Sequence, residues 1–245
     1  MHWGYSMERI ILMVIRSIFQ LPYWLYKIFK LCDIDKYDEP TRYAFLHYLT
    51  PIVNRRGRVK VDCHGLENLP NETGYILFPN HQGLYDALVV LETHVLPITT
   101  VSKKEVENIF FLKQIFRILQ SKFIDREDIR QSMKIMMEVT KEVKEGRNYL
   151  IFPEGTRTKN KNNILEFKSG SFKCAMNAKC PIVPIAIIDS YKAFDMHSIS
   201  KLTVQVHYLK PLYYEDYQGK KSTEIAIIVS DMIRKTIEEY EPKEE

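Results

Sequence analysis

The sequence predicts an α/β protein: a single domain with a mixed sheet flanked by helices, preceded by an N-terminal amphipathic helical hairpin. Two patterns carry this prediction. From residue 59 to residue 239, short apolar or alternating runs typical of strands recur between longer segments with helical spacing. Before them lies a long, almost wholly apolar segment whose few polar residues recur at helical intervals. We expect residues 1–56 to form membrane-docking helices and residues 57–245 to form the α/β domain.

The composition is that of a globular protein. The chain has 245 residues, 45% of them hydrophobic and 27% charged, which is enough for one domain with its own core. Its net charge of +4 is too small to indicate a nucleic-acid-binding protein. The four cysteines form neither a CxxC pair nor a zinc pattern with histidine, so we expect reduced thiols, no metal and no bound cofactor.

The segment 9–31 predicts a helix at a membrane surface. Its polar residues, spaced seven, four and seven positions apart, fall on nearly one line opposite a wide apolar face: Arg9, Arg16, Gln20 and Lys27. These residues interrupt the apolar run too often for a spanning helix, and no signal-peptide cleavage site follows. We expect Pro22 to kink or divide the helix. Three aromatic residues would lie at headgroup level: Tyr23, Trp24 and Tyr26.

A second helix, predicted over residues 41–54, would form a hairpin with the first. It ends in a cluster of three arginines around Gly57, which could meet anionic lipid headgroups. We therefore expect a peripheral, monotopic protein on the cytoplasmic face of the cell membrane. The alternative is that the apolar face of the first helix packs on the rest of the protein.

The remaining elements follow in chain order. Alternating or continuous apolar runs predict strands over seven segments: 59–64, 75–78, 98–102, 122–125, 148–152, 182–188 and 203–209. Helical spacing predicts helices over five segments: 86–94, 108–119, 127–145, 170–178 and 222–239. Gly146 ends the third of these helices.

The stretch FPNHQGLYDALVV, residues 78–90, holds a histidine and an aspartate five positions apart. On a regular helix or strand their side chains point apart, so His81 and Asp86 meet only if the chain bends. Pro79-Asn80 and Gly83 predict such a bend at the carboxyl edge of a sheet, where α/β proteins bind ligands. A paired His81 is a candidate general base. The alternative is that Asp86 caps the following helix and His81 is an ordinary loop residue.

Two further stretches supply candidate anion ligands. In KFIDRED, Arg126 could hold a phosphate through two hydrogen bonds, or form a simple surface pair with Asp125. In FKSGSF, a helix start carries Lys168, Gly170 and Ser171, which predicts either a second anion site or an ordinary cap.

The stretch FPEGTRTK, residues 152–159, follows a predicted strand. Gly155 allows a turn whose amides face an anion, and the hydroxyl of Thr156 and the guanidinium of Arg157 could add to it. Glu154 would repel a phosphate, so we expect it to orient an arginine instead. The alternative is a tight turn followed by a solvated, lysine-rich loop.

Taken in order, NHQGLYD, FIDR, FPEGTR and IVPIAI resemble the four sequence blocks of the glycerolipid acyltransferase family, and best those of bacterial-type 1-acylglycerol-3-phosphate (lysophosphatidate) acyltransferases. The resemblance spans roughly residues 59–210. It implies that His81 and Asp86 are catalytic. It implies that the second and third blocks bind the glycerol-phosphate substrate, through Phe123, Ile124, Asp125, Arg126, Glu154, Gly155, Thr156 and Arg157. For the fourth block it implies a part in the acyl-donor side, through Val183, Pro184 and Ile185.

Two positions depart from the family pattern, which often has serine at Gly83 and glycine at Gln120. The resemblance implies direct acyl transfer from acyl-CoA or acyl carrier protein to the sn-2 hydroxyl of lysophosphatidate, giving phosphatidate. The chain has no GxSxG elbow, so no covalent acyl-enzyme is expected. Alternatives are an acyltransferase for another lysophospholipid, a lipid or thioester hydrolase, and a non-catalytic lipid-binding module.

Overall fold

The computed structural model describes residues 7–107 and 111–242. Within these residues one sheet has the strand order β1-β7-β6-β2-β5-β3-β4. Neighbouring strands are parallel except for β6 and β7, which are antiparallel. The strands are β1 Val59–His64, β2 Ile76–Pro79, β3 Ile98–Lys103, β4 Lys122–Ile124, β5 Asn148–Leu150, β6 Ile182–Ile188 and β7 Leu202–Tyr208. The predicted mixed α/β sheet is confirmed.

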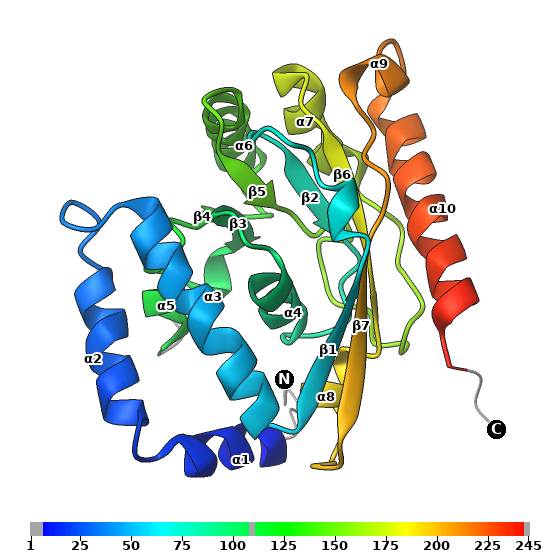
Figure 1. Cartoon of the computed structure of the whole chain (residues 1–245). Helices are drawn as coiled ribbons and strands as arrows, with labels where there is room; N and C mark the ends of the chain where they lie inside the picture. Colours follow the sequence, from blue (N-terminus) through cyan, green and yellow to red (C-terminus); the bar gives the residue numbers. More distant parts are fainter. Residues whose placement is uncertain (1–6, 108–110, 243–245) are drawn as a thin grey trace.

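Helices cover both faces of the sheet (Figure 1). The α-helices are α1 Glu8–Ser17, α2 Leu21–Leu31, α3 Glu39–Arg56, α4 Asp86–Thr93, α5 Leu112–Ile118, α6 Ile129–Lys144, α7 Lys173–Ala178, α8 Tyr191–Phe194, α9 Tyr214–Tyr217 and α10 Ser222–Tyr240. Short 3₁₀ turns are η1 Leu66–Asn68, η2 Lys104–Val106 and η3 Ser169–Phe172. The helix predicted over 108–119 is observed as α5, and residues 108–110 lie outside the described residues.

Two hydrophobic cores lie on opposite faces of the sheet, because side chains along a strand alternate between the faces. In β6, the side chains of Val183, Ile185 and Ile187 lie on the face of the sheet that is covered by α1 to α5 and by α8. Ile182, Ala186 and Ile188 pack against the other face, covered by α6, α7, α9 and α10. Because β6 is buried on both faces, its sequence is a continuous apolar run rather than an alternating one.

The N-terminal segment is divided into α1 and α2, with Pro22 in the first turn of α2 as predicted. The prediction of one continuous basic stripe is wrong at Arg9. This side chain is only 1% exposed, and it enters the protein instead of facing outward. The placement of Trp24 at headgroup level is also wrong: Trp24 is buried, and the guanidinium of Arg56 lies 4.8 Å from its ring.

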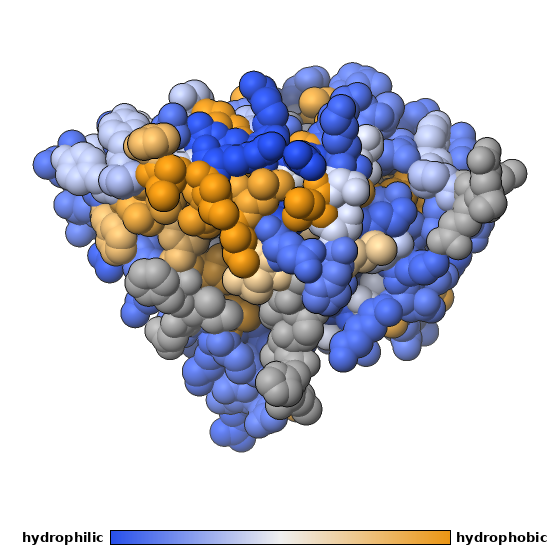
Figure 2. Space-filling view, turned by 90° about the horizontal axis from the view of Figure 1, so that it is seen from below, coloured by the Kyte–Doolittle hydropathy of each residue, from blue (hydrophilic) through white to orange (hydrophobic). Residues whose placement is uncertain are grey.

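The outer face of α1 and α2 remains strongly apolar. Phe19, at the turn between the two helices, is 93% exposed. More than half of the surface of several other large side chains is also exposed: Ile11, Ile15, Ile18, Tyr23, Tyr26 and Phe29. We call these seven residues the apolar face. Figure 2, seen from the side of α1, shows apolar side chains gathered on this part of the surface. Among the described helices, none has the length and hydropathy needed to cross a bilayer.

Candidate active site

His81 and Asp86 meet in a bent loop between β2 and α4. His81 Nδ1 lies 2.7 Å from Asp86 Oδ2, so the predicted contact is confirmed. The Asp86 side chain is fully buried, whereas that of His81 is 21% exposed. The imidazole also stacks on the ring of Phe152, with 4.1 Å between centroids. Since Nδ1 faces the carboxylate, Nε2 is the ring nitrogen left for proton exchange with a substrate.

The Asp86 carboxylate holds the loop that precedes it. Its Oδ2 accepts hydrogen bonds from the amides of Gln82, at 2.7 Å, and Gly83, at 3.0 Å. Its Oδ1 accepts a hydrogen bond from the hydroxyl of Ser190, which follows β6. The carboxylate therefore turns back to the loop rather than capping the amides of α4. These donors stabilise the ionised form and fix the oxygen that meets His81.

The loop is fastened to β6 by Asn80. This buried amide donates to Ile187 O at 2.9 Å and accepts from Ile187 N at 2.7 Å, as a strand neighbour would. Gly83 does not have a positive φ, so the bend depends on the fastened loop and not on left-handed glycine backbone. The small size of Gly83 matters instead, because a β-carbon there would lie 3.0 Å from the Asp195 carboxylate.

Glu154 joins two loops around the histidine, the one that follows β2 and the one that follows β5. It is 1% exposed, and its two oxygens accept from the amides of His81, at 2.6 Å, and Leu165, at 2.9 Å. Both oxygens thus accept from backbone amides, and an orienting contact of Glu154 with an arginine stays a prediction. Burial raises the pKa of Glu154 to about 7, although the two amide donors favour its charged form. The amide of Thr158 completes the junction by donating to His81 O at 2.8 Å.

Two cationic side chains converge beside Gly155. This glycine has a φ of +72°, a backbone conformation that L-residues rarely adopt. A β-carbon at this position would lie 3.7 Å from Lys168 Cγ and 3.9 Å from Arg126 Cζ. The second and third sequence blocks therefore meet here, and Arg126 of the second block and Lys168, which lies outside the four blocks, flank a turn with exposed Thr156. This arrangement can accept an anion.

Arg157 lies near a residue that sequence reasoning missed, Asp195. Burial raises the pKa of the Asp195 carboxyl, the charge of Arg157 opposes this, and the charges of Asp86 and His81 act in opposite directions. Asp195 is therefore within electrostatic reach of Arg157 and of the pair His81 and Asp86, which we call the dyad. It follows α8 and carries no sequence signal that marks it as a site residue.

Other predicted residues lie elsewhere. Asp125 contacts Lys104, with 3.3 Å between Nζ and Oδ2, and accepts from the amide of Glu127 at 3.1 Å. The ring of Phe123 packs on Phe116. Gly170 is an exposed residue of η3, whereas Val183 and Pro184 are buried inside β6. Because Val183 and Pro184 do not contact solvent, they could affect an acyl donor only through the packing of β6.

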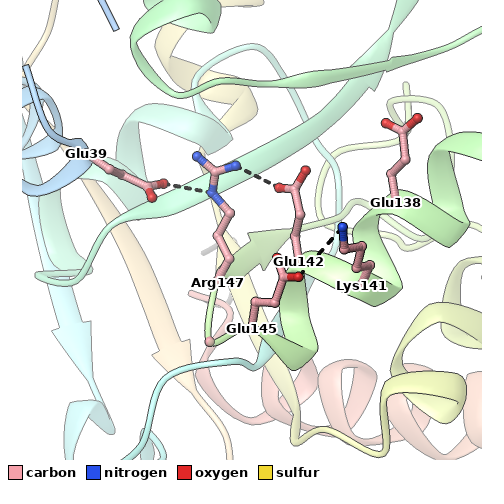
Figure 3. A pocket seen from close by; sticks show the side chains of 7 residues that line it. Glu39, Glu138, Lys141, Glu142, Glu145 and Arg147 are labelled. Carbon is pink, nitrogen blue, oxygen red and sulfur yellow. Dashed lines mark hydrogen bonds and ion pairs between the residues drawn. The ribbon is translucent and has the colours of Figure 1, made fainter. Parts of the chain in front are cut away.

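A cavity of about 530 Å³ lies where α6 ends and β5 begins, away from the carboxyl ends of the strands (Figure 3). Charged side chains line it: Glu39, Glu138, Lys141, Glu142, Glu145 and Arg147. Figure 3 shows Arg147 between two glutamates, with Nε 3.0 Å from Glu39 and Nη1 2.7 Å from Glu142. These pairs join α3 to α6, which assigns this cluster to structure rather than to chemistry.

Comparisons with known proteins cover the segment that carries this site. The family model described as Acyltransferase matches residues 60–188, which include both members of the dyad. The 1-acyl-sn-glycerol-3-phosphate acyltransferase of Borreliella burgdorferi is 28% identical over 185 residues, covering 74% of this chain and 72% of that protein. The Escherichia coli protein of the same name is 27% identical over 184 residues, covering 75% of each.

A solved structure has the same fold along nearly the whole chain. It is the 1-acyl-sn-glycerophosphate (LPA) acyltransferase from Thermotoga maritima, which matches with a TM-score of 0.74 and covers 98% of each chain. The sequence identity is 21%, so the match establishes the shared architecture. The N-terminal helices are part of this architecture, because the coverage leaves almost none of the chain outside it.

Proposed function

The chain belongs to the acyltransferase family, and we propose that it moves an acyl chain from a thioester donor to the sn-2 hydroxyl of lysophosphatidate, giving phosphatidate. The observation that carries this proposal is the 2.7 Å contact between His81 Nδ1 and Asp86 inside the segment that matches the family. The names of the relatives support lysophosphatidate as the acceptor.

His81 acts as general base and then as general acid. Its Nε2 takes the proton of the acceptor hydroxyl while Asp86, on Nδ1, stabilises the imidazolium that forms. The acceptor oxygen attacks the thioester carbonyl carbon, and the tetrahedral intermediate breaks its carbon–sulfur bond. The departing thiolate receives the proton from Nε2, which restores the neutral ring. No acyl group is attached to the protein at any step.

The cations around Gly155 would hold the phosphate of the acceptor. Arg126 and Lys168 flank this turn, and Arg157 follows it two residues later. A phosphate held there would place the acceptor hydroxyl against His81, and such positioning is worth several kcal/mol of barrier, on the order of 7–11 kcal/mol in ideal cases. The acyl donor, as either acyl-CoA or acyl carrier protein, would enter as a co-substrate.

The apolar face would attach the protein to the surface of a bilayer. Seven large side chains exposed on two helices and the turn between them exceed the scattered apolar residues of an ordinary surface. Lysophosphatidate and phosphatidate are both membrane lipids, so peripheral attachment would bring the site to its substrate. The basic Lys27 and Lys30 of α2 would add attraction to anionic headgroups.

The decisive assay supplies purified protein with vesicles containing lysophosphatidate and a panel of acyl-CoA and acyl carrier protein donors. We expect phosphatidate formation in the wild type and its loss in His81→Ala. Release of free fatty acid at the same rate with and without lysophosphatidate would instead identify a hydrolase. Vesicle binding with no turnover of any donor would identify a lipid-binding module.

Attachment is tested separately by the double substitution Ile15→Gln and Phe19→Gln. Both side chains are exposed, so the fold should remain while binding to anionic vesicles weakens by at least tenfold. Ile227→Gln on α10 is the matched control, because Ile227 is 60% exposed outside the apolar face. Equal sedimentation of all three proteins with vesicles would contradict this role.

A further inference from the structure

Ser190 belongs to none of the four sequence blocks, yet it contacts the dyad directly. It is fully buried at the end of β6, and its hydroxyl lies within hydrogen-bond distance of Asp86 Oδ1 and, at 2.9 Å, of Gln82 Oε1. The amide of Ser190 also donates to Gln82 Oε1 at 2.9 Å. Since that amide already serves Gln82, the single hydroxyl proton is available to the carboxylate.

The backbone around Ser190 is held in an unusual conformation. Asp189, just before it, has a φ of +67°, and its amide donates to Asn162 Oδ1 at 2.8 Å. Asn162 also accepts from Gln82 Nε2 at 2.7 Å, so the same buried amide joins both loops. A positive φ is uncommon for non-glycine residues, and here the bonds to Asn162 and Gln82 hold it. The position of the Ser190 hydroxyl is therefore specified by the surrounding structure.

Hydrogen bonds continue from Ser190 to α1. Ser190 O accepts from the amide of Ala193 at 3.0 Å, and Ala193 O accepts from Arg9 Nε at 3.1 Å. The remaining Arg9 nitrogens donate to three further carbonyl oxygens, those of Gly57, Ser198 and Ser200, at 2.6 to 3.0 Å. Burying a guanidinium whose partners are carbonyl oxygens costs free energy, and an apolar side chain at this position of α1 would pack without that cost.

We propose that Ser190 is a positioning residue for Asp86, and that Arg9 holds the segment carrying Ser190, so that the helix bearing the apolar face is joined to the dyad. This inference rests on the proposed acyl transfer for its kinetic readout. Ser190 bonds Asp86 and Gln82, and Arg9 bonds backbone carbonyls, so both act on the reaction through other residues. They fix the carboxylate that orients His81, and they make α1 a support of the site as well as an anchor.

The first test is Ser190→Ala, with Ser230→Ala as its matched control. Ser230 is a buried serine of α10 that bonds Ile227 O, far along the chain from the dyad. Loss of a hydrogen bond to a carboxylate should lower kcat roughly ten- to a hundredfold in Ser190→Ala while leaving KM for lysophosphatidate within about twofold. Ser230→Ala should keep the wild-type kcat. Equal kcat in the two variants would overturn the role of Ser190.

The second test is a double-mutant cycle with Arg9→Lys. Lysine keeps the charge but cannot reproduce a fork that reaches four carbonyl oxygens. We expect Arg9→Lys to lower kcat several-fold in the wild-type protein and to have little effect when Ser190→Ala is already present, because both substitutions interrupt one path. If the two substitutions lower kcat by factors that simply multiply in the double variant, the connection between Arg9 and Ser190 is overturned. Arg234→Lys, at an exposed arginine of α10, is the control, and vesicle binding should stay unchanged throughout.

A readout without substrate separates this inference from the proposed function. The imidazole N–H proton of His81, hydrogen-bonded to Asp86, should give a downfield NMR signal that shifts or broadens in Ser190→Ala and Arg9→Lys. It should stay in place in Ser230→Ala and Arg234→Lys. If no donor yields phosphatidate while this signal responds as expected, the proposed function alone fails. If the wild type is active and the signal ignores both substitutions, this inference alone fails.

Discussion

Strand β5 has a glutamate network at each end, partly buried before the strand and fully buried after it, and the two networks differ in kind. Before the strand, Glu142 meets three partners: Lys122 at 2.6 Å, Arg147 at 2.7 Å and the hydroxyl of Tyr149 at 2.6 Å. After the strand, Glu154 accepts from two backbone amides, those of His81 and Leu165. Burial alone would raise the pKa of both carboxyls. The partners of Glu142 outweigh burial and lower its pKa to about 2, whereas the pKa of Glu154 stays raised at about 7.

The difference separates a structural ion-pair network from a site. At the start of β5 the charges compensate one another, so the cavity there has no group poised to react. At the other end, a buried carboxylate that accepts from two backbone amides lies against the loop of a partly exposed histidine. Strongly shifted pKa values occur in both places, and they run in opposite directions because the partners of the two carboxyls differ.

The largest expected effect comes from Asp86→Asn. The amide oxygen of asparagine can accept the bonds that Asp86 Oδ2 receives, and its NH₂ can donate to Ser190, which then turns its proton to Gln82. The fold should therefore survive, while the imidazolium loses its counter-charge. We expect kcat to fall about 10²- to 10⁴-fold with little change in the thermal unfolding midpoint.

Steady-state kinetics and calorimetry of Asp86→Asn check both halves of this expectation. A variant that unfolds early would show that the carboxylate is needed for the fold. A variant with near wild-type kcat would remove the dyad from the mechanism.

At the start of β5, a substitution should lower stability and leave kcat nearly unchanged. Arg147→Met removes the cation between Glu39 and Glu142, leaving two partly buried carboxylates close together. We expect the free energy of unfolding to fall by about 2–4 kcal/mol, because breaking such a pair strands its partner. Below the unfolding transition, kcat should remain near that of the wild type. Chemical denaturation followed by fluorescence measures the first quantity, and a large drop in kcat would show that the two ends of β5 are coupled.

The same contrast explains what the sequence could predict. Period-two runs and helical spacing are local, so the sheet, most helices and the bend that joins His81 to Asp86 were all predictable. Partners distant in sequence were not: Glu154 is 73 residues from the His81 amide it accepts from, and Ser190 is 104 residues from Asp86. Arg9 shows the same limit, because helical spacing aligns it with Arg16 but cannot reveal carbonyl partners up to 191 residues away.

The smallest effect, and the most diagnostic, is the pH dependence of stability. The folded-state pKa of Glu142 lies below the ordinary value of 4.5, so its contribution is present above pH 4.5 and is lost as pH falls towards 2. The folded-state pKa of Glu154 lies above 4.5, so its contribution is fully present below pH 4.5 and is lost as pH rises to about 7. Each slope is at most about 1.4 kcal/mol per pH unit.

Unfolding free energies of the wild type, Glu142→Gln and Glu154→Gln, measured from pH 3 to pH 8, separate the two contributions. As pH rises from about 3 to 4.5, the free energy of unfolding of the wild type should increase relative to that of Glu142→Gln. Between about pH 4.5 and 7, it should decrease relative to that of Glu154→Gln. Slopes of the same sign would mean that the two glutamates have similar surroundings. Opposite slopes would leave Glu154 as a carboxylate that the fold holds at an energetic cost, in contact with the loop that carries the reacting histidine.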